Sequence, residues 1–188
     1  MATAVTARQR GGMSFLVLVL LASANPDNQE SRSPEARLKA LGIELPPAPK
    51  PIASYVPAVR TGNVVYLAGQ GPLSGGKPTV TGKVGRELSE EEGAKAARTT
   101  VLILLSVLRA EIGSLDRVAR IVKVVGFVNS APGFTRQPWV MNGASDLLVE
   151  VFGEAGRHAR SSVGVSDLPL DIPVEIEMIV EIKPDARP

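Results

Sequence analysis

The stretch HARSSVGVSDLPLDIPVEIEMIVEI, residues 158–182, ends in a regular alternation of apolar and acidic side chains. Apolar residues occupy every even-numbered position from Ile172 to Ile182, and glutamates stand at 175, 177 and 181. A period of two is typical of a β-strand with one face in a core. The other face of this strand carries the glutamates, so it must be covered by something other than the core, either water or another subunit.

A second strand is predicted directly upstream, over residues 160–165. If the two strands pair antiparallel with Val165 opposite Leu170, Arg160 lies opposite Glu175 on the face away from the helices. This pair has two interpretations. Arg160 is either an anion-binding arginine, because a guanidinium can hold a carboxylate through two hydrogen bonds, or part of a structural ion pair worth at most about 1 kcal/mol when exposed. Spacing alone favours the structural ion pair.

The composition suits one globular domain: 188 residues, 44% of them hydrophobic. With 21 basic against 19 acidic residues, the net charge of +2 gives no broad electrostatic reason to expect binding to nucleic acid or to an anionic membrane. The absence of cysteine excludes disulfides and thiolate catalysis. The single histidine, His158, excludes a multi-histidine metal site, and we interpret it as structural or solvated.

Residues 1–32 differ from the rest and are excluded from the fold. Arg8 and Arg10 precede an apolar run over 14–24, a pattern typical of a secretory signal peptide. The run is too short for a bilayer span, which needs about 20 residues. The alternative is an upstream start codon, with the functional protein beginning near Ser33. One domain over 33–183 and a tail over 184–188 remain.

Helical patterns predict two long helices and a short one. The first long helix opens with a capping box at Ser89 and Glu92, which satisfies free backbone N–H groups, and it ends at Gly113. The second covers 140–153. A short helix over 33–41 begins with a serine N-cap followed by proline.

The remaining segments predict strands and their connections. Residues 118–128 are mainly apolar and β-branched and are predicted as a central strand. A hairpin is predicted from strands at 55–59 and 64–68, a stiff connector at 46–51, and a long loop at 69–85. The order predicts an α+β fold, a mixed sheet of five to six strands with two main helices packed on one face.

Two short motifs have structural explanations. Gly69-Gln70-Gly71 lacks the third glycine and the following helix of a dinucleotide-binding loop, and a tight turn beside a pocket explains it better. The acidic run at 90–92 stands at a helix N-terminus, where the helix dipole favours acids, so no cation site is inferred.

Two blocks of sequence resemble one known family. They are Tyr55, Thr61-Gly62-Asn63 and Ala68-Gly69-Gln70 in the first half, with Ala159-Arg160-Ser161, Leu168-Pro169 and Val174-Glu175-Ile176-Glu177 in the second. Together they resemble the Rid family of YjgF type, the reactive-intermediate deaminases, over about residues 50–183. The helix at 33–41 lies outside the usual family core, and residues 144–153 are similar to a divergent bacterial branch.

The resemblance implies a chorismate-mutase-like subunit that assembles as a homotrimer. The glutamate-bearing faces of three sheets would pack around a three-fold axis, with clefts between subunits. Members hydrolyse enamines or imines, such as 2-aminoacrylate, to the 2-keto acid and ammonia. This chemistry needs neither a metal nor an organic cofactor, because an imine is already electrophilic.

The site residues that the resemblance implies are few. Arg160 would grip the substrate carboxylate, and Glu175 would lie near the attacking water. Five further residues would contact the substrate: Tyr55, Ala68, Gly69, Gln70 and Ser162. Ala68 replaces a common serine, Ser162 replaces a common cysteine, and Asn142 lies about three residues upstream of the place expected for a family asparagine.

The alternative function is a non-catalytic trimer that binds small carboxylates and acts as a regulator. It keeps Arg160 but needs no turnover. The expected partners are a small carboxylate or imino acid and other copies of this chain. Ribonuclease activity is not expected, since no aromatic stacking platform or basic groove is evident. The resemblance implies a cytoplasmic protein, or an exported one if residues 1–24 are a signal peptide.

Overall fold

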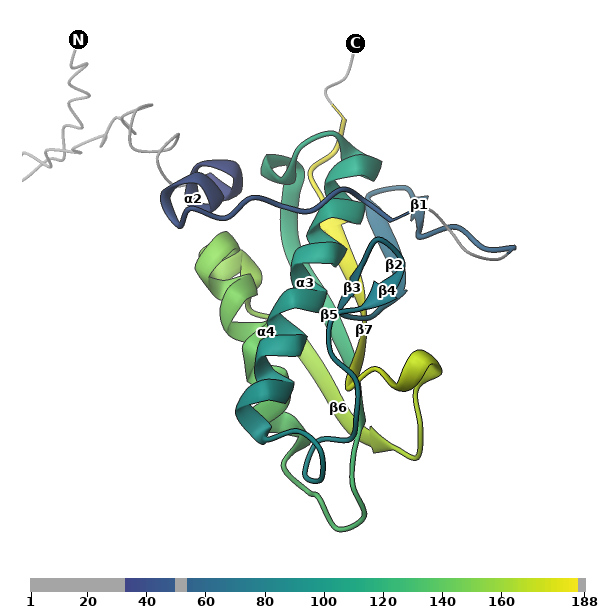
Figure 1. The fold of residues 1–188 in the computed structure, drawn as a ribbon. Helices are drawn as coiled ribbons and strands as arrows, with labels where there is room; N and C mark the ends of the chain where they lie inside the picture. The colour runs from purple at the N-terminus through teal and green to yellow at the C-terminus, as the bar shows by residue number, and fades with distance from the viewer. Residues whose placement is uncertain (1–32, 50–53, 186–188) are drawn as a thin grey trace, which may run out of the picture.

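The computed structural model describes residues 33–49 and 54–185. Its elements, in chain order, are α2 (Pro34–Ala40), β1 (Ala58–Thr61), β2 (Val64–Gln70), β3 (Leu73–Ser74), β4 (Lys77–Pro78), α3 (Glu90–Ile112), the 3-10 turn η1 (Leu115–Arg117), β5 (Val118–Asn129), α4 (Gln137–Phe152), η2 (Gly153–Gly156), β6 (Ala159–Val165), η3 (Pro169–Asp171) and β7 (Val174–Ile182) (Figure 1). The predicted leader lies outside the described residues.

Five strands form one mixed sheet in the order β1-β2-β7-β5-β6, and β3 pairs with β4 in a separate hairpin. Only β5 and β6 run parallel, and the other neighbours are antiparallel. The two long helices α3 and α4 lie side by side on one face of this sheet (Figure 1). The predicted α+β architecture, with a mixed sheet and two main helices on one face, is confirmed.

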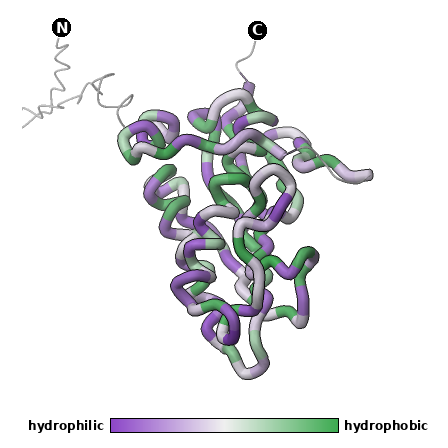
Figure 2. Tube along the Cα trace, in the orientation of Figure 1, coloured by the Kyte–Doolittle hydropathy of each residue, from purple (hydrophilic) through white to green (hydrophobic). Residues whose placement is uncertain are grey.

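The core lies between the sheet and these two helices. The even-numbered residues of β7 are all buried, as the alternation predicts. They meet fully buried leucines of α3 and α4, including Leu104, Leu108 and Leu147. Figure 2 shows how hydrophobic and hydrophilic residues alternate along these elements. Within the described residues, none of the helices combines the length and the hydrophobicity that crossing a bilayer requires.

The helix boundaries follow the capping signals in the sequence. The Ser89 hydroxyl accepts from the Glu92 N–H, and the Glu92 carboxylate accepts from the Ser89 N–H, so the predicted capping box is present. The short helix α2 is tied to the body by Glu35, whose carboxylate accepts from the Leu115 N–H at 3.0 Å and from Arg109 at 3.4 Å.

The predicted C-terminal hairpin is wrong. β6 pairs in parallel with β5, while β7 lies between β2 and β5, so Arg160 is opposite Val124 and Glu175 is opposite Phe127. The physical reason is the helix between them: α4 carries the chain back across the sheet, and such a crossover places the next strand parallel to the previous one. The eight residues after β6 then carry the chain to the centre of the sheet.

Two smaller predictions need correction. The segment 69–85 is not loop throughout, since it contains β3 and β4. β5 is an interior strand but is not buried on both faces, because Lys123, Val125 and Phe127 are only half-buried on the face that the helices leave open.

Candidate active site

Arg160 lies on β6 but points toward α4, contrary to the prediction that it faces away from the helices. Its Nη1 donates to Asn142 Oδ1 at 3.0 Å and to Ser145 Oγ at 2.9 Å, and its Nη2 donates to the Pro138 carbonyl at 3.2 Å. These three acceptors recur along one face of α4, four and three residues apart. The helix therefore orients the guanidinium along the open edge of the sheet.

The charge of Arg160 is not compensated by any ion pair among the described residues. All three of its acceptors are neutral oxygens. A guanidinium has five N–H donors, so two of them remain without a partner in the described part of the chain. The structural ion pair with Glu175 is therefore ruled out, and the side chain can still receive a carboxylate.

His158 takes part in holding Arg160. Its Nδ1 lies 2.6 Å from the Gly156 carbonyl, which can only accept, so Nδ1 carries the proton. Its Nε2 then accepts from the Ser145 hydroxyl at 3.1 Å. Burial, mainly, and the nearby Arg160 charge lower the pKa of His158, which keeps the ring neutral and able to accept. His158 is structural, as predicted, and its structural role is at the arginine.

Three residues of this network were not identified from the sequence as site residues. Asn142 was set aside on its spacing, yet its carboxamide contacts Arg160. Ser145 had no assigned role, and His158 was interpreted as structural or solvated without a link to Arg160. The signal in the sequence was a row of polar residues along one face of an otherwise apolar helix. The strand against which that row packs could not be identified from the sequence.

Ser162, the neighbour of Arg160 on the same side of β6, has a buried hydroxyl without a hydrogen-bond partner among the described residues. A buried hydroxyl of this kind normally has a partner, and leaving it unsatisfied costs about 1–3 kcal/mol. Its position beside the arginine agrees with the predicted substrate-contacting role.

Gly69, on β2, and Glu175, on the central strand β7, form a second cluster. A β-bulge interrupts the pairing of β2 with β7 between Leu67 and Gln70. At Gly69 a side chain is impossible without movement, because a Cβ would lie 2.1 Å from Glu175 Oε1. The glycine thus lets the carboxylate rest on the backbone. Gly69 and Gln70 lie in strand β2 rather than in a tight turn, but they do line a pocket, as predicted.

Glu175 is half-buried, and its pKa is raised, chiefly by desolvation and secondarily by the charge of Glu177. A carboxylate with a raised pKa is a better proton acceptor at neutral pH than an ordinary glutamate. Its electrostatic environment therefore suits a general base or acid.

A cavity of about 1020 Å³ opens beside this cluster and contains most of the predicted substrate-contacting residues. Tyr55, Ala68, Gly69, Gln70 and Glu175 all line it. Five of the seven predicted site residues therefore gather in one place. Arg160 and Ser162 do not.

The two clusters of one chain cannot reach the same small ligand. Glu175, on β7, is two strand spacings from β6, roughly 10 Å, and Gly69, on β2, is three, roughly 14 Å. Arg160 also points to the helix side, whereas Glu175 is on the face of β7 opposite its buried residues. A small imino acid cannot bridge that distance. Each subunit therefore holds two separate halves of the predicted site.

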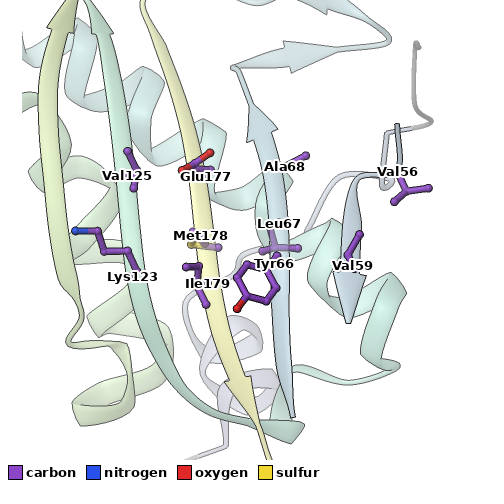
Figure 3. Close-up of a pocket in the computed structure, with 10 residues that line it drawn as sticks. All are labelled: Val56, Val59, Tyr66, Leu67, Ala68, Lys123, Val125, Glu177, Met178 and Ile179. Carbon is purple, nitrogen blue, oxygen red and sulfur yellow. The ribbon is translucent and has the colours of Figure 1, made fainter. Parts of the chain in front are cut away.

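The face of the sheet opposite the helices is apolar and uncovered. Val59, Tyr66 and Val163 are about half exposed, at 54%, 47% and 46%. Val59 pairs with Tyr66 and Tyr66 with Ile179, which extends the apolar row across three strands. A shallow pocket of about 300 Å³ crosses this face, with Lys123 and Glu177 as its charged residues (Figure 3). This is the glutamate-bearing face that needed another covering.

Comparison with known proteins identifies the same family that the sequence motifs around Gly69, Arg160 and Glu175 resemble. Residues 35–182 match the family model described as "YjgF/chorismate_mutase-like, putative endoribonuclease". Protein TCP17 of Trypanosoma cruzi is 47% identical over 148 residues, which cover 78% of this chain and 92% of TCP17. The 2-iminobutanoate/2-iminopropanoate deaminase of Dermatophagoides farinae is 34% identical over 142 residues, which cover 75% of this chain and 95% of that enzyme.

A solved structure has the same fold. The protein Atu1372 of Agrobacterium tumefaciens, described as having unknown function, superposes with a TM-score of 0.75 at 43% identity, over 83% of this chain and 96% of Atu1372. The chain belongs to the YjgF/chorismate-mutase-like family, also called Rid, and its mixed sheet with two main helices is the fold of that family.

Proposed function

We propose that this protein is an imine/enamine deaminase that hydrolyses 2-imino acids to 2-keto acids and ammonia, in clefts between subunits of a homotrimer. Family membership and the 34% identity to a protein named as a 2-iminobutanoate/2-iminopropanoate deaminase support the reaction class. The observation that carries the proposal is the Arg160 guanidinium, which neutral oxygens orient and which no carboxylate in the described part of the chain neutralises. Such a group is suited to the carboxylate of an imino acid.

Two features support assembly into the trimer that is typical of the family. The two halves of the site lie too far apart to act together within one chain, so Arg160 of one subunit must meet Gly69 and Glu175 of another. The uncovered apolar sheet face supplies the contact, since a monomer rarely exposes a continuous apolar patch that has no role.

The reaction needs only positioning and proton transfer. Arg160 holds the substrate carboxylate, and Glu175 takes a proton from water as the water oxygen bonds to the imine carbon. That proton passes to the imine nitrogen, which gives a carbinolamine. The carbinolamine hydroxyl then gives its proton to the nitrogen as the C=O bond forms, the C–N bond breaks and ammonia leaves with the electron pair, so that one imine and one water give one 2-keto acid and one ammonia. General acid–base help of this kind contributes typically about 10²–10⁴-fold. An enamine enters the same route once its terminal carbon is protonated.

The test uses imino acids released from amino acids by an amino-acid oxidase, with the rate of ammonia and keto-acid formation as the readout. We expect the wild type to exceed the buffer rate, and Arg160→Ala to lose at least about 100-fold in kcat/KM, since no other group replaces the charged bidentate contact. Arg157→Ala is the matched control. It removes the same charge three residues away, from a side chain that pairs with Glu154 on the surface.

Two outcomes contradict the proposal. If the wild type releases ammonia no faster than buffer, the protein is not a deaminase of these substrates. If Arg160→Ala retains wild-type kcat/KM, the arginine is not the anchor. Stabilisation of the wild type against heat by 2-ketobutyrate, lost in Arg160→Ala but without turnover of any imine, would favour the carboxylate-binding regulator instead.

A further inference from the structure

The cavity beside Gly69 and Glu175 is far larger than a three-carbon imino acid requires. Such a molecule displaces a handful of waters, on the order of 100 Å³. The cavity measures about 1020 Å³. Most of this space therefore lies beyond the volume that such a substrate would fill.

The part of the cavity away from Glu175, here called the chamber, is mainly apolar. Its wall is built from the proline-rich segment, the β3 hairpin, α3 and η3, and consists mainly of Pro46, Pro47, Leu73, Leu102, Ile103 and Leu170. Among the described residues that line the cavity, Glu175 is the only one with a carboxylate, and no lysine, arginine or histidine lines it. A charged substrate side chain would lose its hydration there without gaining a counter-charge, which disfavours it strongly.

Rigid elements hold the chamber open. The segment leading to Pro46 and Pro47 is anchored by Ile43 and Leu45, which pack against the core, and by α2 upstream. Prolines in succession favour a stiff extended backbone that does not collapse into the space.

The opposite wall of the chamber, at Leu170, has a strained backbone that hydrogen bonds of Asp171 hold in place. Leu170 and Asp171 have φ values of 58° and 54°, in the left-handed region that side chains other than glycine seldom occupy. Asp171 is fixed by two hydrogen bonds, its carbonyl accepting from the Gly82 N–H at 2.8 Å and its carboxylate from Asn129 at 3.0 Å. The strained turn presents Leu170, 58% exposed in this subunit, to the cavity.

We infer that this site selects 2-imino acids with bulky apolar side chains, of leucine or phenylalanine size, over the alanine-sized ones. This inference rests on the proposed deaminase function. The carboxylate binds Arg160 of the neighbouring subunit, the imine carbon lies at Glu175, and the side chain fills the chamber. Each methylene placed in an apolar pocket changes the specificity by about tenfold or more.

The experiment compares kcat/KM for imino acids released from leucine, phenylalanine and alanine by the same oxidase. We expect the leucine- and phenylalanine-derived imines to be preferred over the alanine-derived imine by at least about tenfold. Thr99→Trp adds bulk to the chamber wall from α3 and is expected to narrow or reverse this preference. Lys95→Trp, one turn earlier on the same helix and exposed, adds the same side chain outside the cavity and should keep the preference.

A measurement without turnover separates the two proposals. Calorimetry with 4-methyl-2-oxopentanoate and with pyruvate should give tighter binding for the larger keto acid in the wild type, and a smaller difference in Thr99→Trp. Turnover or binding that favours the alanine-sized compounds overturns the inference and shows that a neighbouring subunit fills the chamber, while the deaminase function stands. Failure with all the imines and both keto acids overturns the proposed function itself.

Discussion

At the scale of single residues, the environment of each candidate group explains what it can do. Arg160 and Glu175 were predicted as partners, and the structure separates them. Each is then left in the state that the proposed chemistry needs, because, within residues 33–49 and 54–185, the guanidinium has no carboxylate partner and the carboxylate has no cationic partner. Had the two paired, the arginine could not bind a substrate and the glutamate would be a poor base.

The raised pKa of Glu175 makes stability depend on pH. A raised pKa in the folded state means that this group favours folding below the ordinary glutamate pKa, and that the benefit is lost as pH rises through the raised value. Glu175→Gln does not titrate, so its melting temperature should exceed that of the wild type near pH 8, and the difference should shrink toward about pH 4. The effect is worth less than about 1 kcal/mol, because half of the side chain is in water.

Thermal unfolding at several pH values checks this expectation. Glu181→Gln, an exposed residue on the same strand, controls for the loss of one negative charge. A difference between Glu175→Gln and the wild type that grows as pH falls would show that the carboxylate is not desolvated. The kcat of Glu175→Gln should fall at the same time, because the variant lacks the proposed base.

At the scale of elements, the β-bulge of β2 is the feature that makes one half of the site. It removes Gly69 from the regular ladder and lets Glu175 lie against its backbone. A bulge beside a functional site commonly redirects a side chain in this way. The backbone of Gly69 does not require a glycine conformation, since its φ is not in the left-handed region.

Gly69→Ala therefore tests the site more than the fold. The added Cβ would lie 2.1 Å from Glu175 Oε1, at the free end of a flexible side chain that can move away. We expect kcat/KM to fall at least about tenfold, with a loss of stability below about 1 kcal/mol. Steady-state kinetics with chemical denaturation distinguishes the two effects. Unchanged kinetics would mean that the position of the Glu175 carboxylate does not matter.

At the scale of the whole molecule, the uncovered sheet face and the divided site lead to the same expectation. The chain should form a homotrimer in which each active site takes Arg160 from one subunit and Glu175 from the next. Sedimentation equilibrium checks the trimer directly. A stable monomer would remove the basis of the proposed site.

Complementation between inactive variants tests the shared site. Arg160→Ala and Glu175→Ala are each expected to be nearly inactive. When the two variants are refolded together in equal amounts, about a quarter of the sites receive both intact residues if neighbours share them, as in a cyclic oligomer. Recovery of about that fraction of wild-type activity is expected. No recovery from verified mixed trimers would mean that both residues act within one chain.

Local patterns in the sequence were sufficient for the helices, for the strands of the main sheet and for the fold class, but not for the short strands β3 and β4. The capping box at Ser89, the spacing of the α4 leucines and the alternation in β7 each depend on residues a few positions apart, so they could be identified from the sequence. The resemblance in the arginine and glutamate motifs also identified the family. The alternation further showed that one face of the last strand needed a cover outside the helix-packed core.

Strand pairing and the orientation of Arg160 were decided only by the tertiary structure. Whether β6 pairs with β7 or with β5 depends on which sheet edge remains free after α4 has crossed the sheet, and this is a property of the whole chain. The same holds for the Asn142, Ser145 and His158 contacts, for the bulge that seats Glu175, and for the chamber, whose walls come from four separate segments. Periodicity specifies which face of a strand is buried, but not which strand lies next to it, because pairing energy is shared among contacts far apart in sequence.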